Sequence, residues 1–350
     1  MRILTQFIVL VTISLVVSGC KVTPAKQVYT PPTTNKTINV YSLIPQDELE
    51  ALYPVQNSSA ATAQFGLVGA LVGVAIDTSI NKSNAEIAEE NLVGIRNELL
   101  HLNFDKLFEE EIVKKLDTNI NVGTIKTVKS YDELEKLISP NETYLVLNTH
   151  YKMDIDFRTP FIVTNVSLNQ KGHGKGKTKV KDSILYKNTF TYFGLSLPAP
   201  IKTQAHIDAE VAKINEDFYK LSEKKQKSRE ARLKRQKKIK KARKSDLDFE
   251  GANKITAHAW STEYKEELDV NLRNGIQQLF TLIANDIDDK TLPETYAKSG
   301  ITLAGYPKYH KSILVEETDT RKVIRFSEGH RAGAICSMPK EESLEKLVCL

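Results

Sequence analysis

A glycine- and lysine-rich run from Gly172 to Thr178 is the part of this chain that comes nearest to a phosphate-binding loop. Such a loop needs four residues between its first glycine and the Gly-Lys pair, and a following helix whose amino end faces the phosphate. Here Gly172 and Gly176 enclose only three residues, and the pattern that follows is typical of a strand. We therefore interpret the run as a basic hairpin turn and not as a nucleotide site.

Residues that could bind metal or attack a substrate are present but dispersed. The seven histidines form no HExxH motif and no pairing with cysteine at metal-ligand spacing, and no serine lies in a Gly-x-Ser-x-Gly elbow. Asp154 and Asp156, on one predicted strand, are interpreted as surface charge. The sequence therefore predicts no catalytic residue, metal or cofactor and favours a non-enzymatic protein. A hydrolase whose site assembles from distant residues remains an alternative.

The strongest charge feature is a segment of dense cations between residues 220 and 244. It holds 14 Lys and Arg against two glutamates, 14 − 2 = +12, whereas the whole chain has a formal net charge of +5. The predicted basic patch comprises Lys224, Lys225, Lys227, Arg229, Arg232, Lys234, Arg235, Lys237, Lys238, Lys240, Lys241, Arg243 and Lys244.

Three kinds of partner fit this positive charge. Anionic lipid, lipopolysaccharide phosphates and an acidic protein are each compatible with a lysine-rich surface. Nucleic acid is disfavoured, because the patch contains no aromatic residue on which a base could stack. The alternative without a partner is a solvated helical arm whose like charges keep it soluble.

Among the three cysteines, Cys20 has the most informative neighbourhood. It ends the string Leu15-Val16-Val17-Ser18-Gly19-Cys20, which follows a positive start at Arg2 and a mostly apolar stretch from Ile3 to Val17. A bilayer span needs about 20 apolar residues, and polar residues interrupt this shorter stretch. The pattern therefore predicts a cleaved signal peptide.

This string resembles the lipobox of Gram-negative bacterial lipoproteins. The resemblance implies that residues 1–19 are removed, that the Cys20 thiol is diacylated, and that the new amino terminus is acylated as well. Several acyl chains on one residue exceed the two membrane signals that stable anchoring requires. Because Lys21 rather than Asp follows the cysteine, the family pattern implies a cell-envelope protein of the outer membrane, expected to face the periplasm.

The other two cysteines, Cys336 and Cys349, are an even pair in a protein expected to be exported. Export to an oxidising compartment permits a disulfide between them, and two free thiols are the alternative.

The most apolar stretch after Cys20 runs from Phe65 to Ile76. Gly66, Gly69 and Gly73 fall on one helical face, a spacing that resembles a glycine zipper and allows close helix packing. The stretch is too short for a full membrane span. A closely packed core helix and a segment inserted into lipid both fit, so a membrane-active protein is a second functional alternative.

The predicted elements divide the chain into a signal peptide (1–19), a Thr- and Pro-rich flexible tether (20–37), a body (38–290) and a small β-rich appendix (291–350). Within the body, capping boxes and apolar spacing predict helices over 83–116, with a break near Asn103, and over 131–140. Strand patterns predict 120–128 and an antiparallel meander of 144–156, 161–168 and 184–193.

A four-three seam from Ile207 to Leu221 predicts a helix that continues into the basic segment as one arm over residues 204–245. Residues 246–254 are predicted to be a loop, with Trp260 packed under the start of a last amphipathic helix that covers Leu268 to Ile287. The expected fold is α+β: an antiparallel three- to five-stranded sheet covered by amphipathic helices, with a long basic helical arm and a small C-terminal β appendix.

The helical region 65–116 and the meander together resemble uncharacterised glycine-zipper envelope lipoproteins. More distantly they resemble the α/β domain of the curli-secretion lipoprotein and the amino-terminal domain of the Tol periplasmic protein. This resemblance implies an accessory or assembly/interaction factor at the outer membrane whose partners are other envelope proteins.

Overall fold

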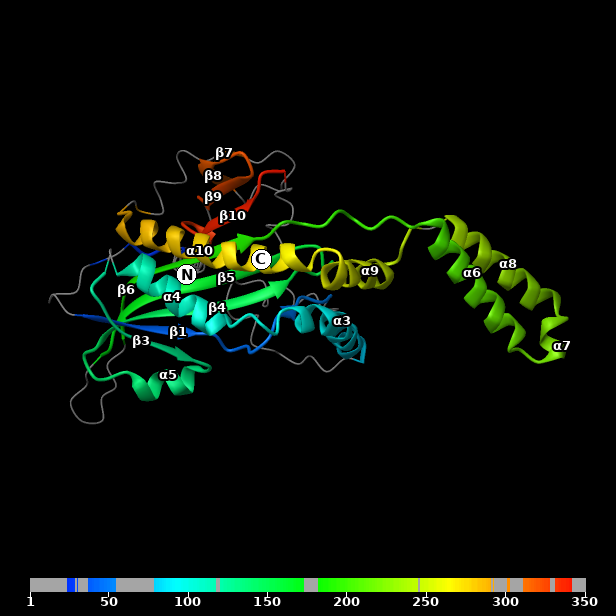
Figure 1. Cartoon of the computed structure of the whole chain (residues 1–350), viewed down its shortest axis with the longest axis horizontal. Coiled ribbons are helices and arrows are strands. Elements are labelled where there is room, and N and C mark those ends of the chain that lie inside the picture. Colours follow the sequence, from blue (N-terminus) through cyan, green and yellow to red (C-terminus); the bar gives the residue numbers. More distant parts are fainter. Residues whose placement is uncertain are drawn as a thin grey trace, which may run out of the picture.

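The computed structural model describes residues 24–28, 30, 37–54, 79–117, 120–172, 182–244, 246–290, 292, 301–302, 311–327 and 331–341. Cys20, the Gly66 to Gly73 stretch, most of the Gly172 to Thr178 run and Cys349 lie outside these ranges. Within them, ten strands form one mixed sheet, and eight helices accompany it (Figure 1).

Three long strands form the centre of the sheet: β4 (Thr143–Met153), β5 (Pro160–Gln170) and β6 (Ser183–Phe193). They pair antiparallel in sequence order, so the predicted meander is confirmed. Asp154 and Asp156 shape the turn between β4 and β5, where their carboxylates accept backbone N–H bonds from Thr159 and Arg158. Such turns favour aspartate because its short side chain can bond to nearby backbone.

The sheet is larger than predicted and it is mixed, which corrects the expected antiparallel sheet of three to five strands. On one side, β1 (Ile38–Leu43) lies between β4 and β3 (Val122–Val128) and runs parallel to both, and the short β2 (Glu50–Ala51) pairs with the end of β4. Parallel neighbours need long crossovers, and local strand patterns do not reveal them.

On the other side, β10 (Ile335–Pro339) pairs parallel with β6, and β9 (Arg321–Phe326), β8 (Lys311–Glu317) and β7 (Ile301–Thr302) follow it antiparallel. The C-terminal strands were expected as a separate small appendix. They are instead a continuation of the central sheet, because β10 uses the free edge of β6.

The main core lies on one face of the sheet, beneath α3 (Ser79–Glu98), α4 (Phe104–Leu116), α9 (Phe249–Thr262) and α10 (Lys265–Asp288). The alternation of β4 places Leu145 and Leu147 in this core, where they join Phe108, Ile276 and Phe280 of the helices. The other face of β4 carries Tyr144 and Val146, which form a smaller cluster with Leu134 of α5 (Tyr131–Leu137). Helices therefore cover both faces near β1 and β4.

Some helices begin where the sequence predicts a cap, and others do not. The break near Asn103 is confirmed, since Asn103 Oδ1 caps α4 by accepting from the N–H of Lys106. α3 begins at Ser79, one turn before the predicted capping box. The loop predicted for 246–254 is wrong: Asp248 caps α9, which starts at Phe249.

The basic segment does not form one continuous arm. α6 (Gln204–Tyr219) ends before Ser222, α7 (Glu223–Gln226) makes a single turn, and α8 (Arg229–Lys244) folds back against α6. The result is a helical hairpin that extends away from the sheet, at the right of Figure 1. The α6 seam thus finds its partner within the same segment, which corrects the expected long arm.

Candidate interaction surface and the docked amino-terminal segment

The basic hairpin, residues 204–244, is held together by an unusual seam. Phe218 of α6 is buried, and the Arg235 guanidinium of α8 lies 4.9 Å from its ring centroid and 5.5 Å from that of Tyr219. Arg235 Nε also donates to Asn215 Oδ1 at 2.8 Å. A cation over aromatic rings thus adds to the contacts of the half-buried apolar residues along the two helices, which are Ile207, Val211, Ile214 and Ile239.

The charge of the hairpin is concentrated on α8. α6 carries four acidic residues and one lysine, 1 − 4 = −3, whereas α8 carries ten cations and one glutamate, 10 − 1 = +9. Residues 204–244 together hold 15 cations and 6 acids, 15 − 6 = +9. Of the 13 predicted patch residues, Arg235 lies in the seam and the other twelve are exposed. The patch is therefore a solvent-facing surface that α6 neutralises only in part.

Exposed apolar groups accompany these cations near the hairpin turn. Tyr219 is 63% exposed, Leu233 46% and Leu221 38%. Apolar and aromatic side chains among positive charges are typical of protein interfaces, in which a Tyr or Arg anchor contributes much of the binding energy.

The hairpin joins the body beyond the carboxyl end of β6. At its base, Lys202 Nζ contacts Glu210 Oε2 at 2.6 Å and donates to the Ala242 carbonyl at 2.9 Å, which ties both helices to the incoming chain. Beyond α8, the chain enters α9, where fully buried Trp260 donates from Nε1 to the Phe157 carbonyl at 2.8 Å. Trp260 thus lies inside α9, the helix that follows the hairpin, and holds that helix on the body. The sequence had predicted it to lie before a helix start.

The described part of the predicted tether, residues 24–28 and 30, is docked on the body, and we call it the docked segment. The N–H of Lys26 donates to the Ala332 carbonyl at 3.0 Å, and Gln27 and Thr30 donate to carbonyls at the start of β6 at 2.8 and 2.9 Å. Gly333 makes room for it: its φ is +91°, and an added Cβ would lie 2.1 Å from Lys26 Cβ. A flexible tether is therefore not what these residues form.

A buried charge network fixes the docked segment. Lys26 Nζ donates to Asp286 Oδ1 at 3.0 Å and to Asp289 Oδ2 at 2.9 Å, and the Lys26 and Asp286 side chains are fully buried. Arg325 bonds to the same two carboxylates at 2.6 and 3.1 Å. The hydroxyl of Tyr186 donates to Asp286 Oδ2 at 2.7 Å, and burial raises its pKa well above the ordinary value. Two cations thus face two carboxylates, the balance that makes buried charge tolerable.

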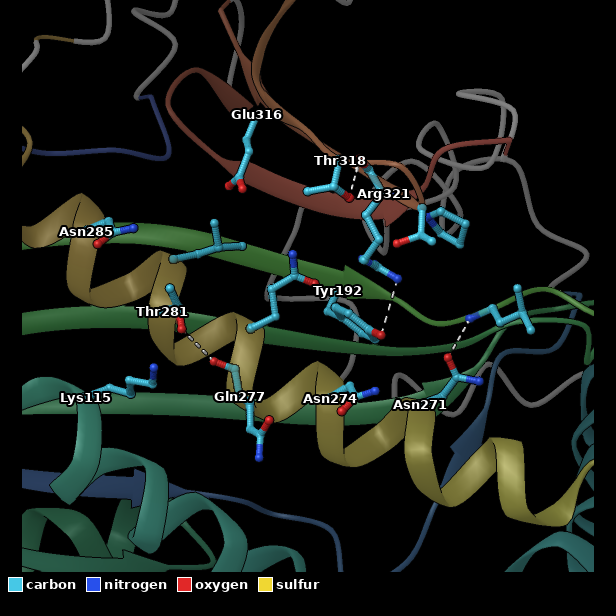
Figure 2. Close-up of a pocket in the computed structure, with 15 residues that line it drawn as sticks. Lys115, Tyr192, Asn271, Asn274, Gln277, Thr281, Asn285, Glu316, Thr318 and Arg321 are labelled. Atoms are coloured by element: carbon cyan, nitrogen blue, oxygen red, sulfur yellow. Dashed lines mark hydrogen bonds between the residues drawn. The ribbon is translucent and has the colours of Figure 1, made fainter.

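A polar groove lies between α10 and the β8–β9 hairpin, with a volume of about 630 Å³ (Figure 2). Uncharged hydrogen-bonding side chains line the α10 wall at spacings of three and four residues: Asn271, Asn274, Gln278, Thr281 and Asn285. On the opposite wall, Arg321 lies 4.1 Å over the Tyr192 ring and donates to the Phe193 carbonyl at 2.6 Å.

The amides and the hydroxyl of α10 suit hydrogen bonding to a polar group, and Lys115 and Glu316, which also line the groove, add one charge of each sign. The sequence did not lead us to predict this groove. The one local pattern that could have indicated it is the regular spacing of amide side chains along α10.

Described histidines lie on separate elements, and His150 of β4 is buried, which lowers its pKa to about 4 with the help of nearby Lys152. Cys336 is buried in β10, and burial raises the pKa of its thiol. Its predicted partner, Cys349, is outside the described residues. The described ranges contain no group of three or more His, Cys, Asp or Glu side chains that could hold a metal ion.

Among the helices that the structure describes, none has the length and apolar character needed to cross a membrane. Comparisons with family models, curated proteins and solved structures found no match to this chain.

Proposed function

We propose that this chain is a non-enzymatic lipoprotein of the bacterial cell envelope, anchored through Cys20 at the outer membrane, that acts as an accessory or interaction factor. Its basic hairpin is the docking surface, and an acidic protein is the partner. The lipobox-like string supports the anchor. The observation that carries the docking role is the hairpin itself, with a net charge of +9 and twelve exposed patch cations.

The hairpin contributes little to the stability of the body, which argues for a role outside folding. Among residues 204–244, only Phe218 and Ala242 are buried hydrophobic residues, and neither belongs to the main core. Ordering 41 residues costs conformational entropy that so little buried surface barely offsets. We therefore explain the presence of the hairpin by binding to a partner and not by folding of the body.

An acidic protein fits the surface better than a lipid head group does. Exposed Tyr219, Leu221 and Leu233 offer apolar contacts beside the cations, as protein interfaces require. Complementary charge would speed the encounter and select the partner, while the apolar anchors would slow its dissociation.

Affinity purification after crosslinking in cells tests the docking role. The test variant reverses three exposed hairpin charges, Lys234→Glu, Lys238→Glu and Lys241→Glu. The matched control reverses three exposed lysines of the body, Lys126→Glu, Lys136→Glu and Lys254→Glu. We expect one or more acidic proteins to be recovered with the wild type and the control, and at least tenfold less with the hairpin variant.

Two results would contradict this proposal. Equal recovery with the hairpin variant would show that the partner binds elsewhere. If the wild type captures no protein, and the hairpin variant loses binding to lipopolysaccharide or anionic vesicles, the partner is an anionic lipid and not a protein. The anchor has its own test: Cys20→Ser should abolish lipid labelling and release the protein from the membrane.

A further inference from the structure

A small cavity of about 290 Å³ lies between the amino-terminal parts of α3 and α9, beside the turn that joins β4 to β5. The two helices lie side by side (Figure 1). Farther along both helices they approach closely, since an added Cβ on Gly94 would lie 3.0 Å from Ser261 Oγ. The cavity is separate from the basic hairpin and from the docked segment, and the proposed function does not use it.

Two asparagine side chains that line this cavity each hold a buried amide atom without a hydrogen-bond partner among the described residues. They are the donor Asn91 Nδ2 on α3 and the acceptor Asn253 Oδ1 on α9. The orientation of the Asn253 amide follows from its other atom, because Nδ2 donates to the Ile155 carbonyl at 3.0 Å and a carbonyl cannot donate in return. A buried polar atom left unpaired costs free energy. One unpaired donor and one unpaired acceptor in the same cavity therefore indicate a ligand that supplies both partners.

Much of the remaining wall of the cavity is apolar. Leu52, Ile87 and Ala88 line it together with the buried ring of Phe157. Phe157 has a φ of +58°, which is unfavourable for a bulky residue, and the bond from Trp260 Nε1 to its carbonyl holds this part of the wall in place. An apolar wall with a few directed polar groups is typical of small-molecule sites.

Aromatic rings and carboxylates complete the lining where it meets solvent. Tyr53 is 40% exposed and Phe249 is 48% exposed. Exposed Asp248 and Glu250 flank Phe249 in the sequence and line the cavity as well. The C–H face of a sugar ring stacks on an exposed aromatic ring, and carboxylates accept hydrogen bonds from sugar hydroxyls. The edge of the cavity therefore has the groups that a sugar ring requires.

We propose that this cavity binds the acetamido group of an N-acetylated amino sugar. The acetamido carbonyl accepts from Asn91 Nδ2, its N–H donates to Asn253 Oδ1, and its methyl group packs against the apolar wall. The sugar ring lies outside, beside Tyr53 and Phe249. A peptide group carries the same donor and acceptor but continues on both sides, whereas the acetamido group ends in a methyl that suits a small cavity. The inference does not depend on the lipid anchor or on the partner of the hairpin.

Titration calorimetry of the full chain in its soluble Cys20→Ser form tests this site, with N-acetylglucosamine as the probe. Glucosamine, which has an amine in place of the acetamido group, and glucose are the control ligands. We expect saturable binding of N-acetylglucosamine and at least tenfold weaker binding of both controls, because neither satisfies the two asparagines. The β-1,4-linked tetramer of the same sugar distinguishes the source. Tighter binding of the tetramer indicates a glycan, and equal affinity indicates the free sugar.

Asn91→Leu separates binding from folding. It removes a donor that has no partner among the described residues, so binding should fall at least tenfold while the thermal unfolding midpoint without ligand stays equal or rises. The matched control is Asn97→Leu, the same change at an exposed position of α3 outside the cavity, which should leave binding unchanged. Asn91→Ala, which only truncates the side chain, replaces the leucine variant if that variant does not fold.

Four results would overturn this site. Absence of saturable N-acetylglucosamine binding to the wild type would show that the cavity holds water only. Equal binding of glucosamine would exclude the acetamido group as the recognised part. Tighter binding of an N-acetylated dipeptide amide than of the sugar would assign the cavity to a peptide. Equal binding by Asn91→Leu and the wild type would place the sugar elsewhere on the protein.

Discussion

Lys26→Ala is the substitution that most sharply tests the docked segment. The lysine makes three bonds of 2.9 to 3.0 Å, to Asp286 Oδ1 and to the carboxylate and backbone carbonyl of Asp289. Its removal takes one of two cations from the network and leaves Arg325 to face both carboxylates, with Tyr186 still donating to Asp286. Removing one member of a buried ion pair costs about 3–5 kcal/mol. The exposed Lys213→Ala on α6 is the matched control, with an expected change within about 0.5 kcal/mol.

Urea unfolding of the soluble Cys20→Ser form at pH 7, followed by Trp260 fluorescence, measures this cost. The chain has one tryptophan, and it is fully buried, so its emission reports loss of the body. With an m value of about 3 kcal/mol/M, the expected loss lowers the urea midpoint by about 1–2 M. Adding Asp289→Asn restores one cation to one carboxylate and should recover part of the loss. A Lys26→Ala midpoint equal to that of Lys213→Ala would refute the network.

Three further predictions follow from single side chains. Trp260→Ala should destabilise the protein by about 3–5 kcal/mol in thermal or urea unfolding, because it leaves a large cavity under α9; a loss below about 1 kcal/mol would contradict its burial. His150 has a folded-state pKa near 4, below its unfolded value of 6.5, so the stability it contributes is complete above pH 6.5 and falls as the pH drops toward 4. His150→Gln should therefore lose less stability between pH 7 and pH 4.5 than the wild type, by about 2–3 kcal/mol, and equal losses would count against this effect. Arg235→Ala should raise hydrogen exchange throughout residues 204–244 without moving the global unfolding midpoint, and unchanged exchange would show that the seam does not depend on the guanidinium.

Local sequence patterns were sufficient to predict the central strands and the helix α10. The runs 144–156, 161–168 and 184–193 are rich in β-branched and aromatic residues, and β4 to β6 follow them in sequence order. The apolar spacing from Leu268 to Ile287 defined α10 equally well. Neighbouring strands and amphipathic helices carry their signal within a few residues.

The outer strands could not be predicted in the same way. Val40 pairs with Ile125, and Cys336 pairs with Thr191, so partners lie 85 and 145 residues apart. Nothing local to either strand specifies a parallel partner at that separation. The C-terminal strands therefore looked like a separate unit until β10 was seen on the edge of β6.

For the basic patch and the docked segment too, local sequence predicted the composition but not the tertiary contacts. Composition alone located the basic patch, but not its fold, because the seam appeared to stop at Leu221. α8 continues that seam with Ala231, Arg235, Ile239 and Ala242, a short stripe that an arginine interrupts. Lys26 looked like one lysine in a polar tether, and its carboxylates are 260 and 263 residues away. Burial of a charge is set by tertiary contacts that sequence spacing does not carry.

Site-specific photocrosslinking in intact cells tests directly whether the basic hairpin binds an acidic protein. A photoreactive residue is placed at Lys238 on the exposed face of α8, and at Lys136 on α5 as the control position. We expect a discrete adduct with an acidic protein from position 238 and none from position 136, and the adduct should disappear when Lys234 and Lys241 are changed to glutamate. Adducts to lipid alone at position 238, or the same products from both positions, would contradict it.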